Sequence, residues 1–143
     1  MAIMKAISIH HQYVIDIIDG LKTEEYRIWP TKHRGDMVIC VTADNASRGY
    51  SCLVVDVYDC VKDGDVYAFK LRNVRAIKPF VVKGQQRIYN LEVPDDLEFF
   101  SLDEEFCTVD EELEFIMQCW KKPPTKKELE ELRVEIETAR GRK

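Results

Sequence analysis

Basic and acidic side chains crowd the stretch between residues 20 and 35. The charged members that could meet a ligand there are Lys22, Glu25, Arg27, Lys32 and Arg34. Residues 24–29 read Glu-Glu-Tyr-Arg-Ile-Trp, and this alternation predicts a strand in which Glu25, Arg27 and Trp29 share one face. Lys and Arg bind phosphate groups, and Arg can use two N–H groups at once. Trp29 could stack on a base or form the floor of a groove.

The same charges also have a simpler interpretation. Charge runs mostly line solvated surfaces, and an exposed ion pair between Glu25 and Arg27 would contribute under ~1 kcal/mol. The chain is acidic overall, with a formal net charge of −5, and nucleic-acid binding depends largely on neutralising phosphates. Local potential matters more than the sum, however, so a basic patch within residues 1–94 remains compatible with that binding.

Hydrophobic periodicity predicts the elements that must position these residues. Short strands are expected over 4–9, 24–29, 36–41, 51–58, 66–71, 76–82 and 87–93. A helix is expected over 11–21, where apolar residues recur at helical spacing and Gly20 can end the helix. Many short strands with one early helix, in about ninety residues, predict a small closed or nearly closed β-barrel.

The charge distribution places a boundary near Pro94. Residues 1–94 hold 13 Lys/Arg and 11 Asp/Glu, whereas residues 95–143 hold 8 and 15. Thr108 and Thr125 each precede a Glu by three residues, and such capping boxes predict two helices in the second part. We therefore expect a barrel domain over 1–94 and an acidic helical extension over 95–143. The last helix should pack on its own barrel rather than form a dimer seam, which favours a monomer.

Composition argues against several classes of protein. The apolar stretches fall far short of the ~20 residues needed to cross a bilayer, and residues 1–8 lack the features of a secretory signal. The five cysteines are odd in number and contain no C-x-x-C pair, so we expect reduced thiols. The three histidines lack zinc-site spacing. We expect a cytoplasmic protein with no membrane association, structural metal or cofactor.

The wider pattern resembles the ASCH domain family of the PUA-like superfamily. Its G-x-K-x-x-E-x-R signature is filled by Gly20, Lys22, Glu25 and Arg27. Matching segments flank it in order and spacing: Ser8-Ile9, Trp29 to Gly35, Tyr67 to Asn73, and Pro79 to Gly84 followed by Arg87-Ile88-Tyr89. The resemblance covers residues 4–93. It implies an α+β fold built on a PUA-like barrel, with a cleft for a nucleotide or single-stranded RNA.

The sequence and the resemblance together predict an RNA-binding module. The expected nucleic-acid-binding residues are Ser8, Lys22, Glu25, Arg27, Trp29, Lys32 and Arg34. Residues 10–13 depart from the R-Q-P-W that relatives often carry after Ser-Ile, so contacts from that loop do not transfer.

The alternative is a hydrolase acting on an acylated cytidine or an RNA phosphodiester, with Lys22 and Glu25 as its catalytic residues. The resemblance includes a branch of the family that contains such amidohydrolases, and this branch has Thr where this chain has Glu25. The hydroxyl expected in their mechanism is therefore missing here. A neighbouring carboxylate also favours a charged ammonium on Lys22, which suits electrostatic contact better than proton abstraction. We therefore favour binding over catalysis.

Overall fold

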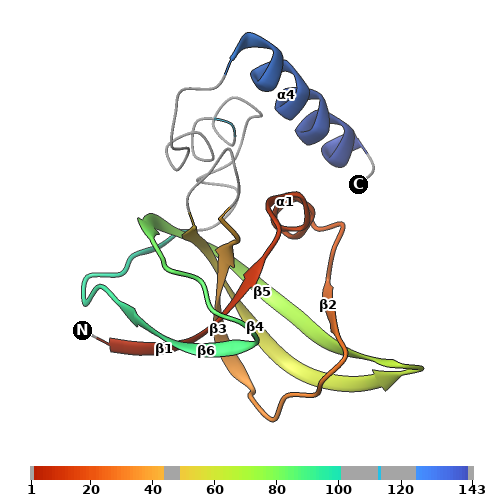
Figure 1. Ribbon diagram of the computed structural model, residues 1–143, viewed down its shortest axis with the longest axis vertical. Helices are drawn as coiled ribbons and strands as arrows, with labels where there is room; N and C mark the ends of the chain where they lie inside the picture. The colour runs from red at the N-terminus through yellow and green to blue at the C-terminus, as the bar shows by residue number, and fades with distance from the viewer. Residues whose placement is uncertain (1, 44–48, 101–112, 114–124, 142–143) are drawn as a thin grey trace.

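The computed structural model describes residues 2–43, 49–100, 113 and 125–141. The elements are β1 (Ala2–Ile9), α1 (His11–Ile18), β2 (Glu24–Arg27), β3 (Gly35–Val41), β4 (Tyr50–Asp63), β5 (Val66–Val81), β6 (Ile88–Val93), β7 (Phe99–Phe100) and α4 (Lys126–Gly141). The fold is mostly strand, with an early helix and a C-terminal helix (Figure 1). The predicted α+β class is therefore confirmed.

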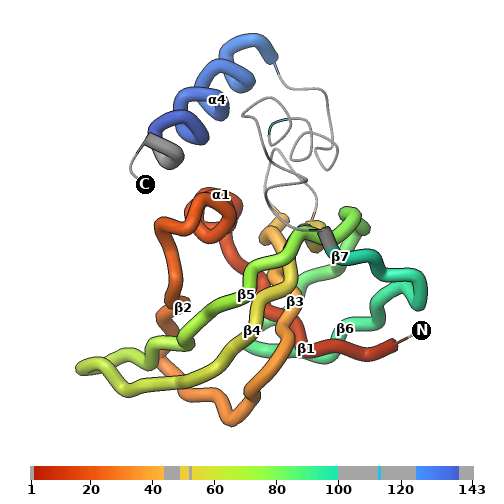
Figure 2. Tube along the Cα trace, turned by 180° about the vertical axis from the view of Figure 1, so that it is seen from behind, coloured from red at the N-terminus to blue at the C-terminus, as the bar shows by residue number. Residues whose placement is uncertain are grey.

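The strands form one sheet in the order β2-β5-β4-β3-β1-β6, with β7 paired to β5. β1 and β3 run parallel, and the other pairs are antiparallel. The sheet bends around the core (Figures 1 and 2). Within the described residues no pairing joins β2 to β6, so the closure of the expected PUA-like barrel stays a prediction.

The long β4–β5 hairpin differs from the prediction. The two strands expected over 66–71 and 76–82 form the single strand β5. Its register against β4 shifts at three places instead of the chain turning, and Asn73 within it has a positive φ of 51°. Bulges of this kind increase the local bend of a strand without ending it. The hairpin turns at Gly64, whose φ of 62° lies in the left-handed region that glycine adopts at little cost.

The main core lies between the concave side of the sheet and α1. Helix α1 buries Val14, Ile15, Ile17 and Ile18, because these positions form one stripe at helical spacing. Leu132 and Ile136 of α4 are buried in the same cluster, and α1 lies between the sheet and α4 (Figures 1 and 2). In the described part of the chain, no helix has the length and apolar character needed to span a membrane.

One of the two expected capping boxes is present at the start of α4. The backbone N–H of Glu128 donates to Thr125 Oγ1 over 3.2 Å, and the N–H of Thr125 donates to Glu128 Oε1 over 3.1 Å. The capping box expected at Thr108 lies outside the described residues. The division into two units near Pro94 stays a prediction.

Candidate functional site

Strand β2 places alternate side chains on opposite sides of the sheet. It pairs with β5 so that Glu25 lies opposite Phe69 and Arg27 opposite Tyr67. Glu25 is 6% exposed, whereas Tyr26 is 48% exposed. Just beyond β2, the Trp29 ring packs against Phe69 with 5.4 Å between ring centroids. The predicted sharing of one face by Glu25, Arg27 and Trp29 is therefore confirmed.

The buried carboxylate of Glu25 joins two cations. Arg27 Nη2 donates to Glu25 Oε2 over 2.9 Å, and Lys22 Nζ lies 3.3 Å from Glu25 Oε1. Arg27 Nη2 also donates to the backbone carbonyl of Ser8 over 3.1 Å. Interactions of this kind are stronger in a partly desolvated site than in water. One carboxylate between two cations leaves the group with an excess of one positive charge.

Lys22 also faces an open cleft. Its ammonium lies 5.3 Å from the centre of the Tyr13 ring and 5.5 Å from that of Tyr26, distances at which an aromatic face attracts a cation. The cleft, of about 390 Å³, lies between α1 and β2 and is lined by Tyr13, Asp16, Leu21, Lys22, Thr23, Glu24 and Tyr26. Lys22 thus connects the buried Glu25 to a cleft with two exposed tyrosines.

Glu24 forms a second polar group on the outer face of β2. Its carboxylate accepts hydrogen bonds from Lys70 Nζ and, over 2.6 Å, from the Tyr26 hydroxyl. The bond from Lys70, followed by that from Tyr26, lowers the pKa of Glu24 below its usual value. The same bonds raise the pKa of Lys70 and of Tyr26. Glu24 is therefore a charged wall of the cleft, held in place by two side chains.

Ser8 supports Arg27 through its backbone. Its hydroxyl lies 2.8 Å from the Tyr89 hydroxyl, so this group is already engaged within the protein. Burial raises the pKa of Tyr89. Burial also raises the pKa of the neighbouring Cys40, to about 11, although a hydrogen bond from Tyr89 opposes this shift. The observed contact of Ser8 with the site is thus the hydrogen bond from Arg27 to its backbone carbonyl.

Lys32 and Arg34 follow Trp29 in the chain. They belong to the turn between β2 and β3, at the end of the sheet away from α1 (Figure 1). Arg34 Nη1 donates to the carbonyls of Thr31 and His33, and its Nη2 lies 3.8 Å from Asp59 Oδ1. The observed contacts therefore join Ser8, Lys22, Glu25, Arg27 and Trp29, and those of Arg34 are made with other residues. The binding role of Lys32 and Arg34 stays a prediction.

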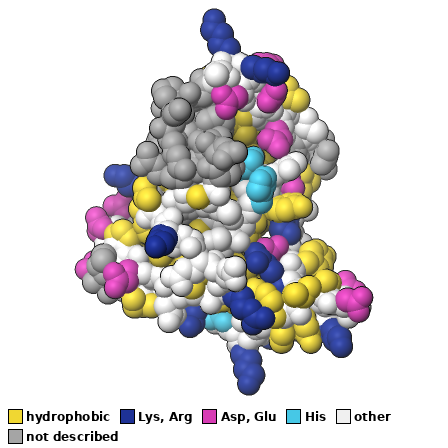
Figure 3. Space-filling model, viewed as in Figure 1, with side chains coloured by type: hydrophobic (Ala, Val, Ile, Leu, Met, Phe, Trp, Pro, Cys, Tyr) yellow, Lys and Arg dark blue, Asp and Glu magenta, His cyan; other side chains and the backbone are white. Residues whose placement is uncertain are grey.

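The space-filling view shows Lys and Arg side chains among hydrophobic ones on the sheet half of the molecule (Figure 3).

Two kinds of residue at the site were missed by the sequence prediction. Tyr13 and Tyr26 flank Lys22, and Arg87 lies with its guanidinium carbon 5.1 Å from the centre of the Trp29 ring. Tyr13 stands at the Trp position of the R-Q-P-W segment, which was the available signal. Arg87 gave no local signal, because its partner Trp29 is distant in the sequence.

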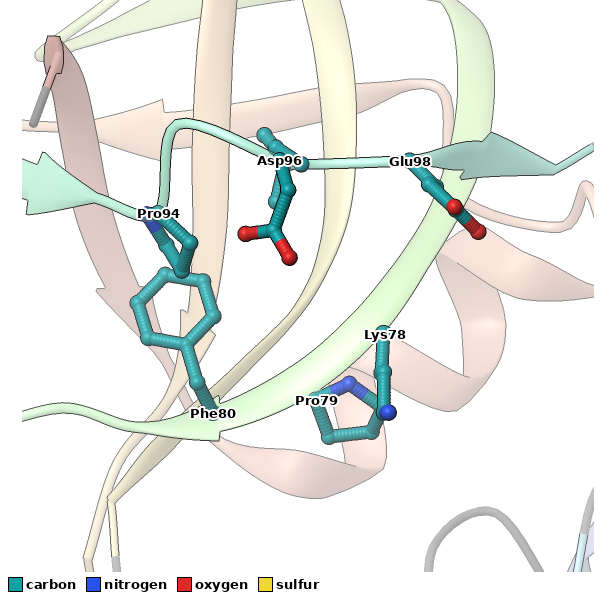
Figure 4. A pocket seen from close by; sticks show the side chains of 7 residues that line it. Lys78, Pro79, Phe80, Pro94, Asp96 and Glu98 are labelled. Carbon is teal, nitrogen blue, oxygen red and sulfur yellow. The ribbon is translucent and has the colours of Figure 1, made fainter.

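A second hollow lies between the end of β5 and the connection from β6 to β7. It has a volume of about 320 Å³ and is lined by Lys78, Pro79, Phe80, Pro94, Asp96, Leu97 and Glu98. Figure 4 shows the side chains that line it. None of the expected site residues lines this hollow. Among the described residues, no group of three or more His, Cys, Asp or Glu could hold a metal ion.

Comparison with known proteins gives one family. A sequence model of the ASCH domain matches residues 7–117. This range includes every expected site residue from Ser8 to Arg34, and Arg87 as well. No curated protein matches the chain with significant similarity. Because the family model covers more than half of the sequence, the chain belongs to the ASCH domain family.

Proposed function

We propose that the protein binds single-stranded RNA, or a nucleotide unit of it, at the site around Glu25. The observation that carries this proposal is the buried carboxylate that holds Lys22 and Arg27 side by side with an excess of positive charge. The ASCH domain family, to which the chain belongs, is generally thought to bind RNA. The same proposal includes the closure of the sheet into a PUA-like barrel and a cleft in that barrel for the ligand.

Arg27 has donors left for a phosphate. Within the described residues, its bonds to Glu25 and to the Ser8 carbonyl both leave from Nη2. The guanidinium group carries five N–H donors in a fixed plane, so Nη1 and Nε remain for an anion. The Arg27 side chain is 26% exposed, so part of it is open to solvent.

The tyrosines beside Lys22 suit the bases of a single strand. Tyr13 and Tyr26 are 54% and 48% exposed, and exposed aromatic rings bind bases by stacking with little dependence on sequence. Lys22 Nζ lies 3.3 Å from Glu25 Oε1 and within the distance of both tyrosine rings at which an aromatic face attracts a cation. This supports phosphate or base recognition by Lys22 and gives the hydrolase alternative no specific support.

The test is a salt series with short fluorescently labelled single-stranded RNA, followed by fluorescence anisotropy. Lys22→Ala and Arg27→Ala should each weaken binding, and each lost phosphate contact should reduce the slope of log affinity against log salt by about 0.7. Lys62→Ala, at the exposed hairpin end of β4, removes the same charge and should leave the slope unchanged. Wild-type protein without salt-sensitive affinity for RNA would refute the proposal.

A further inference from the structure

Trp29 contacts two guanidinium groups that come from different parts of the chain. The guanidinium carbon of Arg27 lies 5.7 Å from the ring centre and that of Arg87 lies 5.1 Å from it. Phe69, from the core, packs against the same ring. A ring surrounded in this way is better suited to hold the two arginines than to stack on a base. Of its two expected roles, Trp29 therefore fits the floor of a groove.

The two arginines belong to the outermost strands of the sheet order. Arg27 is the last residue of β2, and Arg87 immediately precedes β6. These strands stand at opposite ends of the order β2-β5-β4-β3-β1-β6. The Trp29 ring is thus the point at which side chains from the two ends of the sheet meet.

Arg87 differs from the other arginines of the sheet in its charge environment. Arg27, Arg34, Arg72 and Arg75 each pair with a carboxylate. Within the part of the chain that the structure describes, no carboxylate pairs with Arg87. Among those residues, the Arg87 guanidinium contacts an aromatic ring and no counter-charge, and the same ring is contacted by the Arg27 guanidinium. An anion that contacts both guanidinium groups would supply a counter-charge for Arg87 and gain charge-assisted hydrogen bonds.

The backbone at Arg87 also departs from common geometry. Its φ is 61°, and the other described non-glycine residue with a positive φ is Asn73. Asn adopts this left-handed region readily, whereas a long side chain such as Arg does so rarely. Such a conformation persists only where the surrounding structure imposes it, and these positions concentrate at binding sites.

We propose that Arg87 is a phosphate-binding residue, and that Arg27 and Arg87, both held on Trp29, form a clamp for one phosphate group of the ligand. The assignment of RNA as the source of that phosphate rests on the proposed function. The clamp places a phosphate at Trp29 and leaves the exposed tyrosines of the Lys22 cleft for a base. It adds a residue outside the signature segment to the binding site.

The first test compares two arginine variants in the RNA salt series. Arg72 is a matched control, because its guanidinium carbon also lies over an aromatic ring, 4.6 Å from the centre of Tyr58, and it is exposed on β5. Arg87→Gln should weaken RNA binding and reduce the salt slope by about 0.7, whereas Arg72→Gln should match the wild type. If wild-type protein binds RNA and the two variants behave alike, the clamp is refuted while RNA binding stands.

The second test uses inorganic pyrophosphate and does not depend on RNA. In ¹H–¹⁵N spectra, the Nε–H signals of Arg27 and Arg87 and the indole N–H of Trp29 should shift together as pyrophosphate is added. The shifts of Arg27 and Trp29 should be lost in Arg87→Gln and kept in Arg72→Gln. If wild-type protein fails to bind RNA, this joint shift still supports the clamp and refutes only RNA as its ligand. If wild-type protein binds no RNA and the joint shift is also absent, both RNA binding and the clamp are refuted.

Discussion

Arg27 donates a hydrogen bond of 2.9 Å to Glu25, two residues earlier on the same face of β2. Glu25 is 6% exposed, and its other carboxylate oxygen lies 3.3 Å from Lys22 Nζ. The two ion pairs compensate for the hydration that a buried carboxylate loses. Equally, the carboxylate is the group that allows two cations to sit close together.

Replacing this carboxylate should therefore destabilise the fold. Glu25→Gln removes the charge but keeps the shape, leaving Lys22 and Arg27 close to one another without a counter-charge. We expect the free energy of unfolding, measured by urea denaturation, to fall by about 1–3 kcal/mol. Glu92→Gln, on an exposed position of β6, should change it by less than ~0.5 kcal/mol. Equal stability of the two variants would mean that Glu25 does not organise the site.

Glu24 should contribute stability that depends on pH. The hydrogen bond from Lys70, and then that from Tyr26, lowers the pKa of Glu24 in the folded protein below its ordinary value of 4.5. A lowered folded pKa means that the contribution is complete above the unfolded pKa and is lost as the pH falls through the folded one. The difference in unfolding free energy between wild type and Glu24→Gln should thus be largest near neutral pH and shrink in acid. A difference that is constant from neutral to acidic pH would contradict this assignment.

The local pattern of the sequence was sufficient to predict which side chains share a face at the strand that carries Glu25 and Arg27. Alternation predicts that Glu25, Arg27 and Trp29 share a face, and pairing with β5 puts that face against Phe69 in the core. The capping box at Thr125 is likewise a short-range feature, because both of its hydrogen bonds join residues three apart. Features set by neighbours in the sequence were predicted correctly.

Features set by pairing between distant strands were not predicted from the sequence. The ion pair of Arg34 with Asp59, which the sequence did not indicate, depends on the pairing of β3 with β4. Arg87 meets Trp29 only because the loop before β6 returns to the end of β2. The bulges that merge two predicted strands into β5 are also adjustments to the register of a partner strand. None of these contacts leaves a periodic signal in the chain.

Gly84 lies close to the Ser8 hydroxyl, which would have to move to admit a side chain at position 84. A Cβ atom at position 84 would lie 2.9 Å from Ser8 Oγ, the hydroxyl that is bonded to Tyr89. Gly84→Ala should therefore reduce the free energy of unfolding by about 1 kcal/mol, because the added methyl group would push the Ser8 hydroxyl away from its hydrogen bond with Tyr89.

Removing the hydroxyl should relieve this strain. Ser8→Ala alone should cost about 1 kcal/mol through the lost hydrogen bond, but Ser8→Ala combined with Gly84→Ala should cost less than the two single changes together. Urea denaturation of the four proteins completes the double-mutant cycle. Strictly additive losses would show that Gly84 is not constrained by Ser8.

The docking of α4 onto the rest of the protein can be tested with two positions of the same helix. Ile136 is fully buried in the core cluster that also contains residues of α1, whereas Val134 is 50% exposed. Ile136→Ala leaves a cavity and should lower the free energy of unfolding by about 2–4 kcal/mol. Val134→Ala removes a smaller, solvent-facing side chain and should change it by less than ~0.5 kcal/mol. If both variants unfold at the same urea concentration as the wild type, α4 does not contribute its buried face to the core in solution.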